Sequence, residues 1–562
     1  MQEYIVTLHN REDLDDFYND METPGGDLYI PDRAVDLELR RSISRNTHYM
    51  LTPEEVIELK NDPRVLGVES KAFLDLLQCE LNGYSDTGPF KRNGDSISAT
   101  DKNWGLYRHV IGANALSGEW GADGTATITP GTNTITASGK NVDVLIVDGH
   151  ITTTAQAHPE FAVNADGTGG SRVQAFNWFS LANQLGLGPN ATYNYGTMGN
   201  ETDTNHGVHV AGTVAGNTQG WAREANIYNI EAPVSSATNH GYSGLQSGTM
   251  WDYIREWHNT KTINAETGRR NPTISNHSYG FTISKDIYIS GPANGYAGYD
   301  GIGQFKYRGV TFDKYGDEGS DLTNAELEAR GINVQADGNW IIPYAGISWG
   351  ADIADAIADG IIIVTSAGNS YQKTVKSGDQ DYENYIYFRS GSDTSAFAAP
   401  SHRSSSIGLE AATLNVGSLD SFKNDRKNDF SVCGNAVDIF AAGAGIVSST
   451  LTGSFGGVQD SRNGSYYLSK IGGTSMAAPQ VAGVIALLAE SNPNITQADA
   501  NAWIEANATT SEMFDSGTDS STDFGSLQGA PNKILMWKNQ RPETGMSFPK
   551  VNAKARPTSG LA

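Results

Sequence analysis

Two uninterrupted apolar runs mark the hydrophobic pattern of this chain, at residues 144–147 and 361–364. A run of apolar residues that no polar residue interrupts over the length of a strand predicts a central strand of a parallel sheet, buried on both faces. The first run ends in Asp148 and the second is followed by a small-residue turn that ends in Asn369. In open α/β sheets, the carboxyl ends of the strands form the binding edge. The pattern therefore predicts an α/β fold with Asp148 at that edge, although an ordinary turn after a strand would have the same sequence.

A segment of small and β-branched residues at 205–213, Asn-His-Gly-Val-His-Val-Ala-Gly-Thr, predicts the start of a buried helix. Small residues let another backbone pack closely while the imidazole of His206 faces a cleft. His206 and His209 could instead share one helical face and bind a metal. No Glu joins them in the His-Glu-x-x-His manner, and no cysteine or carboxylate run supplies further ligands. The sequence therefore favours His206 as a base and keeps a metal site as the minor alternative.

The stretch Gly-Gly-Thr-Ser-Met-Ala-Ala-Pro at 472–479 places Ser475 in a tight, glycine-flanked turn. Pro479 is expected to open the helix that the following apolar positions predict. Backbone N–H groups at the start of a helix stabilise negative charge. The hydroxyl of Ser475 is therefore a candidate nucleophile.

A serine hydroxyl needs a base before it can act as a nucleophile. His206 can supply that base, and Asp148 can hold the imidazole in the correct tautomer. The amide of Asn369 can donate to a developing oxyanion beside the backbone N–H of Ser475. A plain Gly-Asn turn is the alternative interpretation of Asn369.

The order Asp, His, Asn and Ser, each inside its own motif, resembles the subtilisin-like serine proteases. The histidine motif matches the family's His-Gly-Thr-His-Val-Ala-Gly except for Val208, and residues 473–479 match Gly-Thr-Ser-Met-Ala-Ala-Pro. Two further segments resemble the family's substrate-pairing strand and its oxyanion segment. The residues that the resemblance assigns to substrate binding are Ser278, Tyr279, Gly280, Ala367 and Gly368.

The resemblance implies a subtilisin-like three-layer α/β/α catalytic domain with a mostly parallel central sheet. It also implies a serine endopeptidase that cuts protein or peptide substrates through an acyl-enzyme and needs no cofactor for catalysis. Its triad would be Asp148, His206 and Ser475, with Asn369 as the oxyanion donor. A non-enzymatic alternative stays open, in which a catalytically decayed subtilisin-like fold serves as a structural or binding component of a larger assembly.

The aspartate motif departs most from the family. The family has Ser or Thr and then Gly after the aspartate, whereas here Gly149 follows Asp148 directly. The downstream sequence His-Pro-Glu-Phe at 158–161 is similar to the family's His-Pro-Asp-Leu and supports the assignment. Asp143 and Asp203 are the alternative carboxylates.

The N-terminus carries a second resemblance. An alternating strand at 3–8, a helix with Thr52 as N-cap and Pro53 as first residue, and a return to strand at 65–68 are similar to the inhibitory, fold-assisting prosegment of subtilisin-like proteases. A small α+β domain unrelated to inhibition is the alternative. The predicted layout is listed by residue range: a prosegment-like domain at 1–76, a linker with the processing site at 77–103, the catalytic domain at 104–538 and a flexible tail at 539–562.

A long segment separates Gly280 from the second apolar run. The family needs little more than one helix there, which we expect at 352–359. Residues 281–345 are therefore an insertion beside the substrate-binding strand. It could cover the cleft, bind a protein partner or be surface elaboration.

Composition limits the remaining possibilities. A net charge of −25 argues against nucleic-acid binding, and two cysteines exclude a disulfide framework. The chain shows no secretory signal and no stretch that approaches a membrane span, so an intracellular place or a place in an assembly is favoured. Calcium is common in the family that the chain resembles, but the sequence does not map its ligands; Asn200, Glu201 and Asp203, near a predicted loop, are candidates for a structural calcium.

Overall fold

The computed structural model describes most of the chain. The described residues are 1–30, 43–71, 78–79, 96–98, 104–113, 132–178, 181, 201–232, 247–284, 301–313, 323–334, 340–344, 346–390, 393–403, 407, 412–421, 425–453, 457–517 and 525–538. The tail at 539–562 and most of the linker at 77–103 lie outside this set. Within it, no helix is long and apolar enough to cross a membrane.

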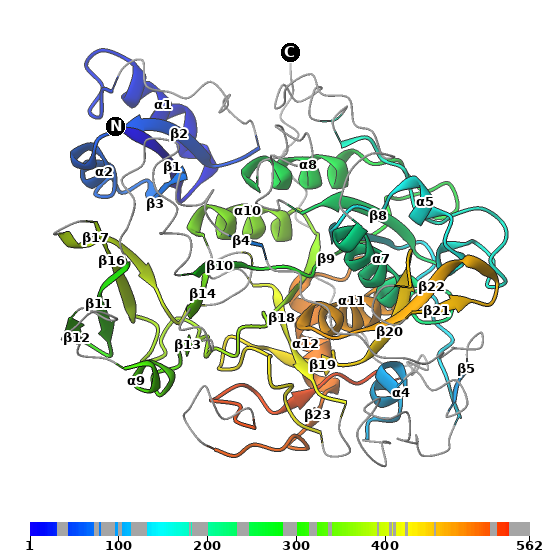
Figure 1. Ribbon diagram of the computed structural model, residues 1–562. Coiled ribbons are helices and arrows are strands. Elements are labelled where there is room, and N and C mark those ends of the chain that lie inside the picture. The colour runs from blue at the N-terminus through cyan, green and yellow to red at the C-terminus, as the bar shows by residue number, and fades with distance from the viewer. Residues whose placement is uncertain are drawn as a thin grey trace, which may run out of the picture.

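An eight-stranded sheet forms the centre of the protein (Figure 1). Its order is β23-β24-β19-β18-β15-β9-β7-β8, and every neighbouring pair from β24 to β8 is parallel. The strands are β7 (Asp143–Asp148), β8 (Asn226–Glu231), β9 (Thr273–His277), β15 (Ile362–Ser366), β18 (Leu414–Leu419), β19 (Ile439–Ala442), β23 (Thr509–Thr510) and β24 (Lys533–Ile534).

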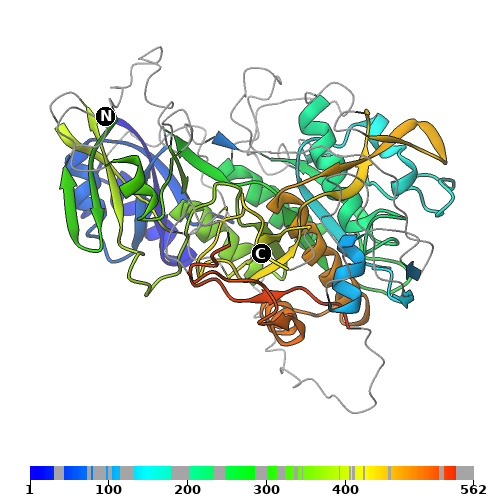
Figure 2. The same cartoon turned by 60° about the horizontal axis from the view of Figure 1, so that its bottom comes forward.

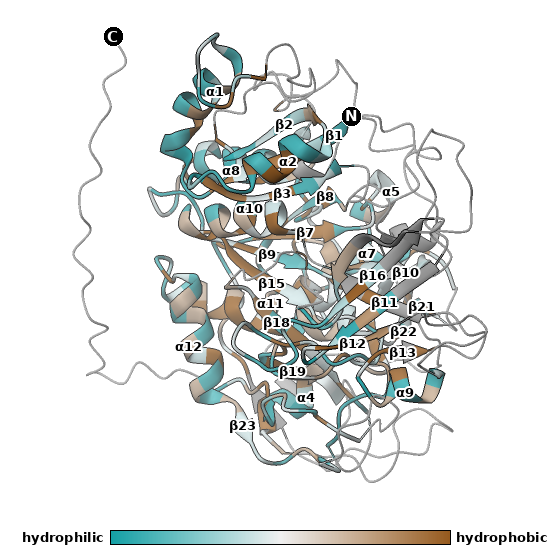
Figure 3. Cartoon of the chain, turned by 90° about the vertical axis from the view of Figure 1, so that its left-hand side faces the viewer, coloured by the Kyte–Doolittle hydropathy of each residue, from teal (hydrophilic) through white to brown (hydrophobic). Residues whose placement is uncertain are grey.

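Both faces of this sheet are covered, as the unbroken apolar runs predict. On β7, Val144 and Ile146 join a core cluster that includes apolar residues of two helices, α7 (Glu201–Ala215) and α11 (Thr474–Ser491). Leu145 and Val147 join the opposite cluster, which is shared with α8 (Ser247–Thr260) and α10 (Ile347–Ala358). In Figure 3 hydrophobic colouring accordingly marks central strands such as β15, whereas the outer helix α1 is largely hydrophilic. The expected three-layer α/β/α fold is confirmed.

The N-terminal residues form a small unit with its own core. Its antiparallel sheet has the order β2-β1-β3 and carries two helices on one side. The elements are β1 (Gln2–Leu8), α1 (Leu14–Glu22), β2 (Asn46–Leu51), α2 (Pro53–Leu59) and β3 (Val65–Ser70). Thr52 and Glu55 form a capping box at the start of α2. The unit rests against α10, at the opposite end of the molecule from the small sheet formed by residues 446–471 (Figure 2).

The segment after Gly280 builds two further sheets. One has the order β13-β14-β10-β4 and the other β12-β11-β16-β17, so the insertion pairs with a hairpin from beyond Asn369. The strands are β4 (Gln78–Cys79), β10 (Phe281–Ser284), β11 (Gly301–Tyr307), β12 (Val310–Asp313), β13 (Asn333–Val334), β14 (Trp340–Tyr344), β16 (Tyr385–Ser390) and β17 (Asp393–Pro400).

The helix that follows this segment begins earlier than predicted. α10 starts at Ile347 rather than at residue 352, because Glu69 of the N-terminal unit accepts hydrogen bonds from the backbone N–H groups of Ile347 (2.9 Å) and Ser348 (2.8 Å). A carboxylate at this position satisfies donors that a helix leaves free at its start. The cap is distant in sequence, so the local pattern gives no sign of it.

The remaining elements lie at the periphery. A three-stranded sheet of order β20-β22-β21 leads into α11, and β5 pairs antiparallel with β6. These and the other short elements are β20 (Ile446–Thr450), β21 (Val458–Asp460), β22 (Asn463–Ile471), β5 (Ser96–Ser98), β6 (Thr132–Thr134), η1 (Arg11–Asp13), α4 (Trp104–Ile111), α5 (Thr153–Gln156), η3 (Pro159–Phe161), α9 (Asn324–Glu328) and α12 (Gln497–Asn507).

Candidate active site

Asp148 and His206 meet at the carboxyl end of the central sheet. Asp148 ends β7 and is fully buried, and its Oδ1 lies 2.6 Å from Nδ1 of His206 on α7. Because a carboxylate only accepts hydrogen bonds, Nδ1 carries the proton and Nε2 presents a lone pair. Nε2 is buried and has no hydrogen-bond partner among the described residues. The imidazole is therefore held in the tautomer that a general base needs.

A glycine sets the distance between these two residues. A Cβ atom at Gly207 would lie 2.2 Å from the carbonyl oxygen of Gly149, so any other residue would push α7 away from the turn that follows Asp148. Asn205 anchors the same end of the helix, because its Oδ1 accepts a hydrogen bond from the Leu451 N–H at 2.7 Å. The small residues of the histidine motif thus serve close packing, as the sequence predicts.

His209 belongs to the packing of α7 and not to a metal site with His206. Its Nε2 lies 2.8 Å from the carbonyl oxygen of Ile446 and 3.1 Å from that of Ser469. Burial lowers the pKa of His209 to about 3, so the ring is neutral and donates from Nε2. Within the described residues, no group of three or more His, Cys, Asp or Glu side chains could hold a metal ion.

Ser475 lies in the first turn of α11 and is almost completely buried. Its Oγ donates to the carbonyl oxygen of Ser278 at 2.9 Å, and the Oγ of Ser278 donates back to the carbonyl oxygen of Ser475 at 2.8 Å. No hydrogen bond between Ser475 and His206 is among the described contacts. In free enzymes such catalytic contacts often form only when substrate is bound.

The helix begins five positions before the proline that was expected to open it. α11 starts at Thr474, so Pro479 lies inside the helix. Proline has no N–H, and a residue four positions earlier in a helix therefore loses its backbone partner. That residue is Ser475, and its free carbonyl oxygen is the one that Ser278 contacts.

Asn369 follows β15 and is held by Thr474, the residue before Ser475 in the chain. The Oδ1 of Asn369 accepts hydrogen bonds from the N–H and the hydroxyl of Thr474, both at 2.9 Å. Because Thr474 holds the amide oxygen, the NH₂ group of Asn369 points away from Thr474. Gly368 donates from its N–H to the Thr474 hydroxyl at 3.1 Å and has φ +107°, which favours glycine. Sequence reasoning gave Thr474 no role, although it stands inside the Gly-Thr-Ser motif.

The remaining predicted substrate-binding residues lie beside this site. Ser278, Tyr279 and Gly280 connect β9 to β10, and the first two are buried. The Oγ of Ser366 donates to the carbonyl oxygen of Tyr279 at 3.4 Å, which ties this segment to the end of β15. Ala367 is fully buried in the core, so its side chain packs there.

The alternative carboxylates lie elsewhere. Asp143 is at the opposite end of β7, where its Oδ2 lies 2.8 Å from Nζ of Lys261 and its Oδ1 accepts from Asn271 at 2.8 Å. Asp203 lies in the first turn of α7 and not in a loop as expected. Its side chain lies outside the described set, as does that of Glu201, and Asn200 is not described at all. The structure therefore describes none of the candidate calcium ligands' side chains.

Comparison with known proteins decides the family. The sequence model of the Subtilase family matches residues 139–526, more than half of the chain. This chain belongs to the subtilase family. The match spans the segments that carry Asp148, His206, Asn369 and Ser475. The expected family is thereby confirmed.

Individual relatives are distant. This subtilase is 22% identical over 494 residues to alkaline serine exoprotease A of Vibrio alginolyticus, covering 86% of this chain and 57% of that protein. It is 24% identical over 483 residues to an alkaline proteinase of Hapsidospora chrysogena, covering 84% and 82%. The solved structure of fervidolysin from Fervidobacterium pennivorans, described as a keratinolytic enzyme related to subtilisin, aligns at 18% identity with a TM-score of 0.46, covering 94% of this chain and 60% of that one. The family assignment rests on the family model and not on the alignment with the fervidolysin structure.

The first prediction concerns Asn369. Asn369→Ala should lower kcat by roughly 10²–10³-fold with KM little changed, about 3–4 kcal/mol, because an oxyanion donor acts mainly in the transition state. Steady-state kinetics on a peptide substrate measure both constants. Thr474→Val removes only the hydroxyl that holds the amide and should cost less. A rise in KM alone would make Asn369 a substrate-binding residue instead.

The second prediction separates the three carboxylates. Asp148→Asn should leave the fold intact and lower kcat by about 10⁴-fold, because the amide favours the wrong imidazole tautomer. Asp143→Asn and Asp203→Asn should each cost far less. The three variants are compared at matched folding, judged by circular dichroism. A larger loss from Asp143→Asn or Asp203→Asn would move the triad carboxylate to that residue.

Proposed function

We propose that this subtilase is a serine endopeptidase with Asp148, His206 and Ser475 as its triad. The observation that carries the proposal is the 2.6 Å contact between Asp148 Oδ1 and His206 Nδ1, which leaves Nε2 as a free base. The α11 helix that carries Ser475 packs against the α7 helix that carries His206. Together they supply a nucleophile and a base on adjoining helices at one edge of the sheet.

The proposed reaction follows from these groups. Ser475 Oγ attacks the carbonyl carbon of the peptide bond while His206 Nε2 takes the hydroxyl proton. The carbonyl oxygen becomes an oxyanion, which the Asn369 amide and the Ser475 N–H stabilise. His206 then gives its proton to the leaving amine, and an acyl-enzyme remains. A water molecule, deprotonated by His206, hydrolyses that ester and restores the Ser475 hydroxyl.

The N-terminal unit is proposed to be an inhibitory prosegment. Its Glu69 caps the start of α10, with an additional contact of 2.8 Å to the Ser348 hydroxyl. Its Asn46 donates to Asp352 Oδ2 at 3.0 Å, in a contact that is fully buried. Arg45 adds an ion pair of 3.3 Å with Asp355. These polar contacts fix the unit on the helix that directly precedes β15.

The strand that follows this unit lies against the substrate side. β4 pairs antiparallel with β10, with Cys79 opposite Phe281 and Gln78 opposite Thr282. β10 continues directly from Gly280, so the end of the N-terminal region occupies an edge that an extended substrate would use. This pairing supports the proposal that the chain delivers its own linker to Ser475.

The third prediction tests the nucleophile. Ser475→Ala should abolish peptidase activity, by about 10⁴-fold or more, with little loss of folding. His206→Ala should cost a similar amount, and the double variant should be no worse, because the two groups act as a unit. A fluorophosphonate probe should label the wild type and not Ser475→Ala. An unlabelled wild type would instead favour the decayed, structural alternative.

The fourth prediction is self-processing within residues 77–103. The carbonyl oxygen of Ser278 contacts Ser475 Oγ, so the residue opposite Ser278 marks the expected cut. Counting on from the pair Cys79–Phe281 in the β4–β10 register, that residue is Asn82. Residues 80–95 lie outside the described set, so this position comes from the count alone. We therefore expect a cut between Asn82 and Gly83.

Mass spectrometry of purified protein measures this cut. The wild type should give a chain that begins at Gly83, and Ser475→Ala should stay at full length. A cut elsewhere between residues 77 and 103 would keep self-processing and reject the register. A wild type that keeps residues 1–76 attached would make the N-terminal unit a permanent domain.

A further inference from the structure

A fully buried carboxylate, Glu160, joins its own segment to two other parts of the chain. Its Oε1 accepts from the Thr218 hydroxyl at 2.6 Å and from Arg462, and its Oε2 accepts from the backbone N–H groups of Thr218 (2.9 Å) and Gln219 (3.1 Å). Burial alone would raise the pKa of Glu160, but the charge of Arg462 and the Thr218 contacts outweigh it and hold the pKa below its usual value. Glu160 is therefore a charged, buried anion.

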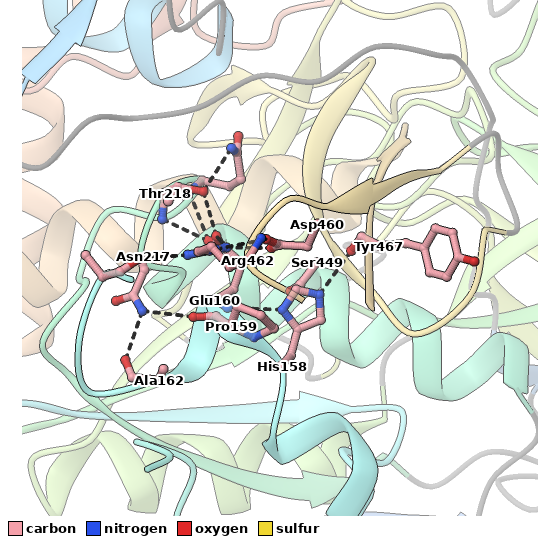
Figure 4. A network of polar contacts seen from close by, with 12 residues as sticks. His158, Pro159, Glu160, Ala162, Asn217, Thr218, Ser449, Asp460, Arg462 and Tyr467 are labelled. Atoms are coloured by element: carbon pink, nitrogen blue, oxygen red, sulfur yellow. Dashed lines mark hydrogen bonds and ion pairs between the residues drawn. The ribbon is translucent and has the colours of Figure 1, made fainter. Parts of the chain in front are cut away.

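Arg462 supplies the opposite charge (Figure 4). Its guanidinium lies between Glu160 and Asp460, and its Nη2 donates to Asp460 Oδ2 at 2.6 Å while its Nε donates to Asp460 Oδ1 at 2.9 Å. Its Nη1 also reaches the carbonyl oxygen of Ala165 at 3.2 Å. The planar, forked guanidinium is suited to binding two carboxylates and a carbonyl at once, which the point charge of a lysine is not.

The three parts joined here are the three that carry the triad. Glu160 lies in η3, in the segment that follows Asp148. Thr218 and Gln219 follow the end of α7, the helix of His206. Arg462 lies in the turn between β21 and β22, and β22 leads directly into α11 and Ser475. The Glu160–Arg462 ion pair thus joins the segments of Asp148 and Ser475, and the hydrogen bonds from Thr218 and Gln219 add the segment of His206.

Neutral contacts brace the same junction. His158 accepts from the Glu160 N–H at its Nδ1 (3.1 Å) and contacts the carbonyl oxygen of Tyr467 on β22 through its Nε2 (3.0 Å). Burial lowers the pKa of His158, which keeps the ring neutral and its proton on Nε2. Asn217 donates from Nδ2 to the carbonyl oxygens of Pro159 (3.0 Å) and Ala162 (2.9 Å). These groups add no charge. A second buried arginine, Arg172, donates to the carbonyl oxygen of Glu160 at 2.8 Å, whereas Arg462 is the cation that pairs with the Glu160 carboxylate.

We infer that Arg462 is a positioning residue for catalysis, which holds the segments of Asp148, His206 and Ser475 in register through Glu160. The inference rests on the proposed triad. It follows that loss of Arg462 displaces the triad segments relative to one another and leaves a buried carboxylate unpaired. A displacement of about 1 Å at reacting groups can cost on the order of 10²-fold in rate. The substrate-binding segment at 278–280 contacts none of these groups, so KM should change little.

The test compares Arg462→Met with a matched control, Arg108→Met. Arg108 is a more deeply buried arginine, with its side chain 2% exposed against 13% for Arg462, and it pairs with Asp425 (2.8 Å) and Glu512 (3.1 Å). None of the segments that it joins carries a triad residue. Both variants should lose thermal stability. Active sites are counted with the fluorophosphonate probe, and kcat is expressed per labelled site. Both kcat and KM are measured well below the unfolding midpoint.

We expect kcat per labelled site to fall by about 10- to 100-fold in Arg462→Met, with KM within about twofold of wild type, and to stay within about twofold in Arg108→Met. If Arg462→Met does not fold, Arg462→Lys decides, with an expected fall in kcat of about 3- to 10-fold. Methylguanidinium should restore kcat to Arg462→Ala and leave Arg108→Ala unchanged. Unchanged kcat in every folded Arg462 variant would overturn the positioning role. A wild type that the probe does not label would overturn the proposed function itself.

Discussion

The arrangement of the site depends on one constraint, the burial of the Asp148 carboxylate at the end of β7. A charged carboxylate withdrawn from water is costly unless it is paired and hydrogen-bonded. His206 Nδ1 at 2.6 Å and the Gly149 N–H at 2.7 Å provide the pairing. The imidazole reaches it only because Gly207 lets α7 approach the turn after β7. The position of this helix, and with it the packing of α11 against α7, follows from that contact.

The features that the sequence predicts correctly are those whose cause is local. The apolar run at 144–147 is a central strand because its alternate residues face two different cores, and a pattern of adjacent residues records that directly. The capping box of Thr52 is likewise complete within four residues. Short motifs around His206 and Ser475 carried much of the resemblance to the family, since the chemistry needs each residue in one backbone setting.

The features that the sequence did not reveal depend on contacts between distant segments. Glu69 belongs to the N-terminal unit, yet it determines where α10 starts. Arg462 pairs with Glu160, which lies far earlier in the sequence. Asp143 resembles a second candidate carboxylate until Lys261 is seen beside it. In each case the charge is visible in the sequence but its partner is not, because ion pairs leave no periodic pattern along the chain.

Pro479 shows how the helix that carries Ser475 accommodates its function. The helix lacks one backbone donor at that position, so the carbonyl oxygen of Ser475 bonds outward to Ser278 instead of along the helix. An alanine there would restore the donor and strengthen the helix, but it would compete with Ser278 for the same oxygen. The first turn of α11 thus has one hydrogen bond fewer along the helix, and in exchange it is fixed to Ser278 at the end of β9. The missing N–H of Pro479 lowers the stability of the helix and at the same time holds Ser475 in place, which is a trade-off between stability and activity.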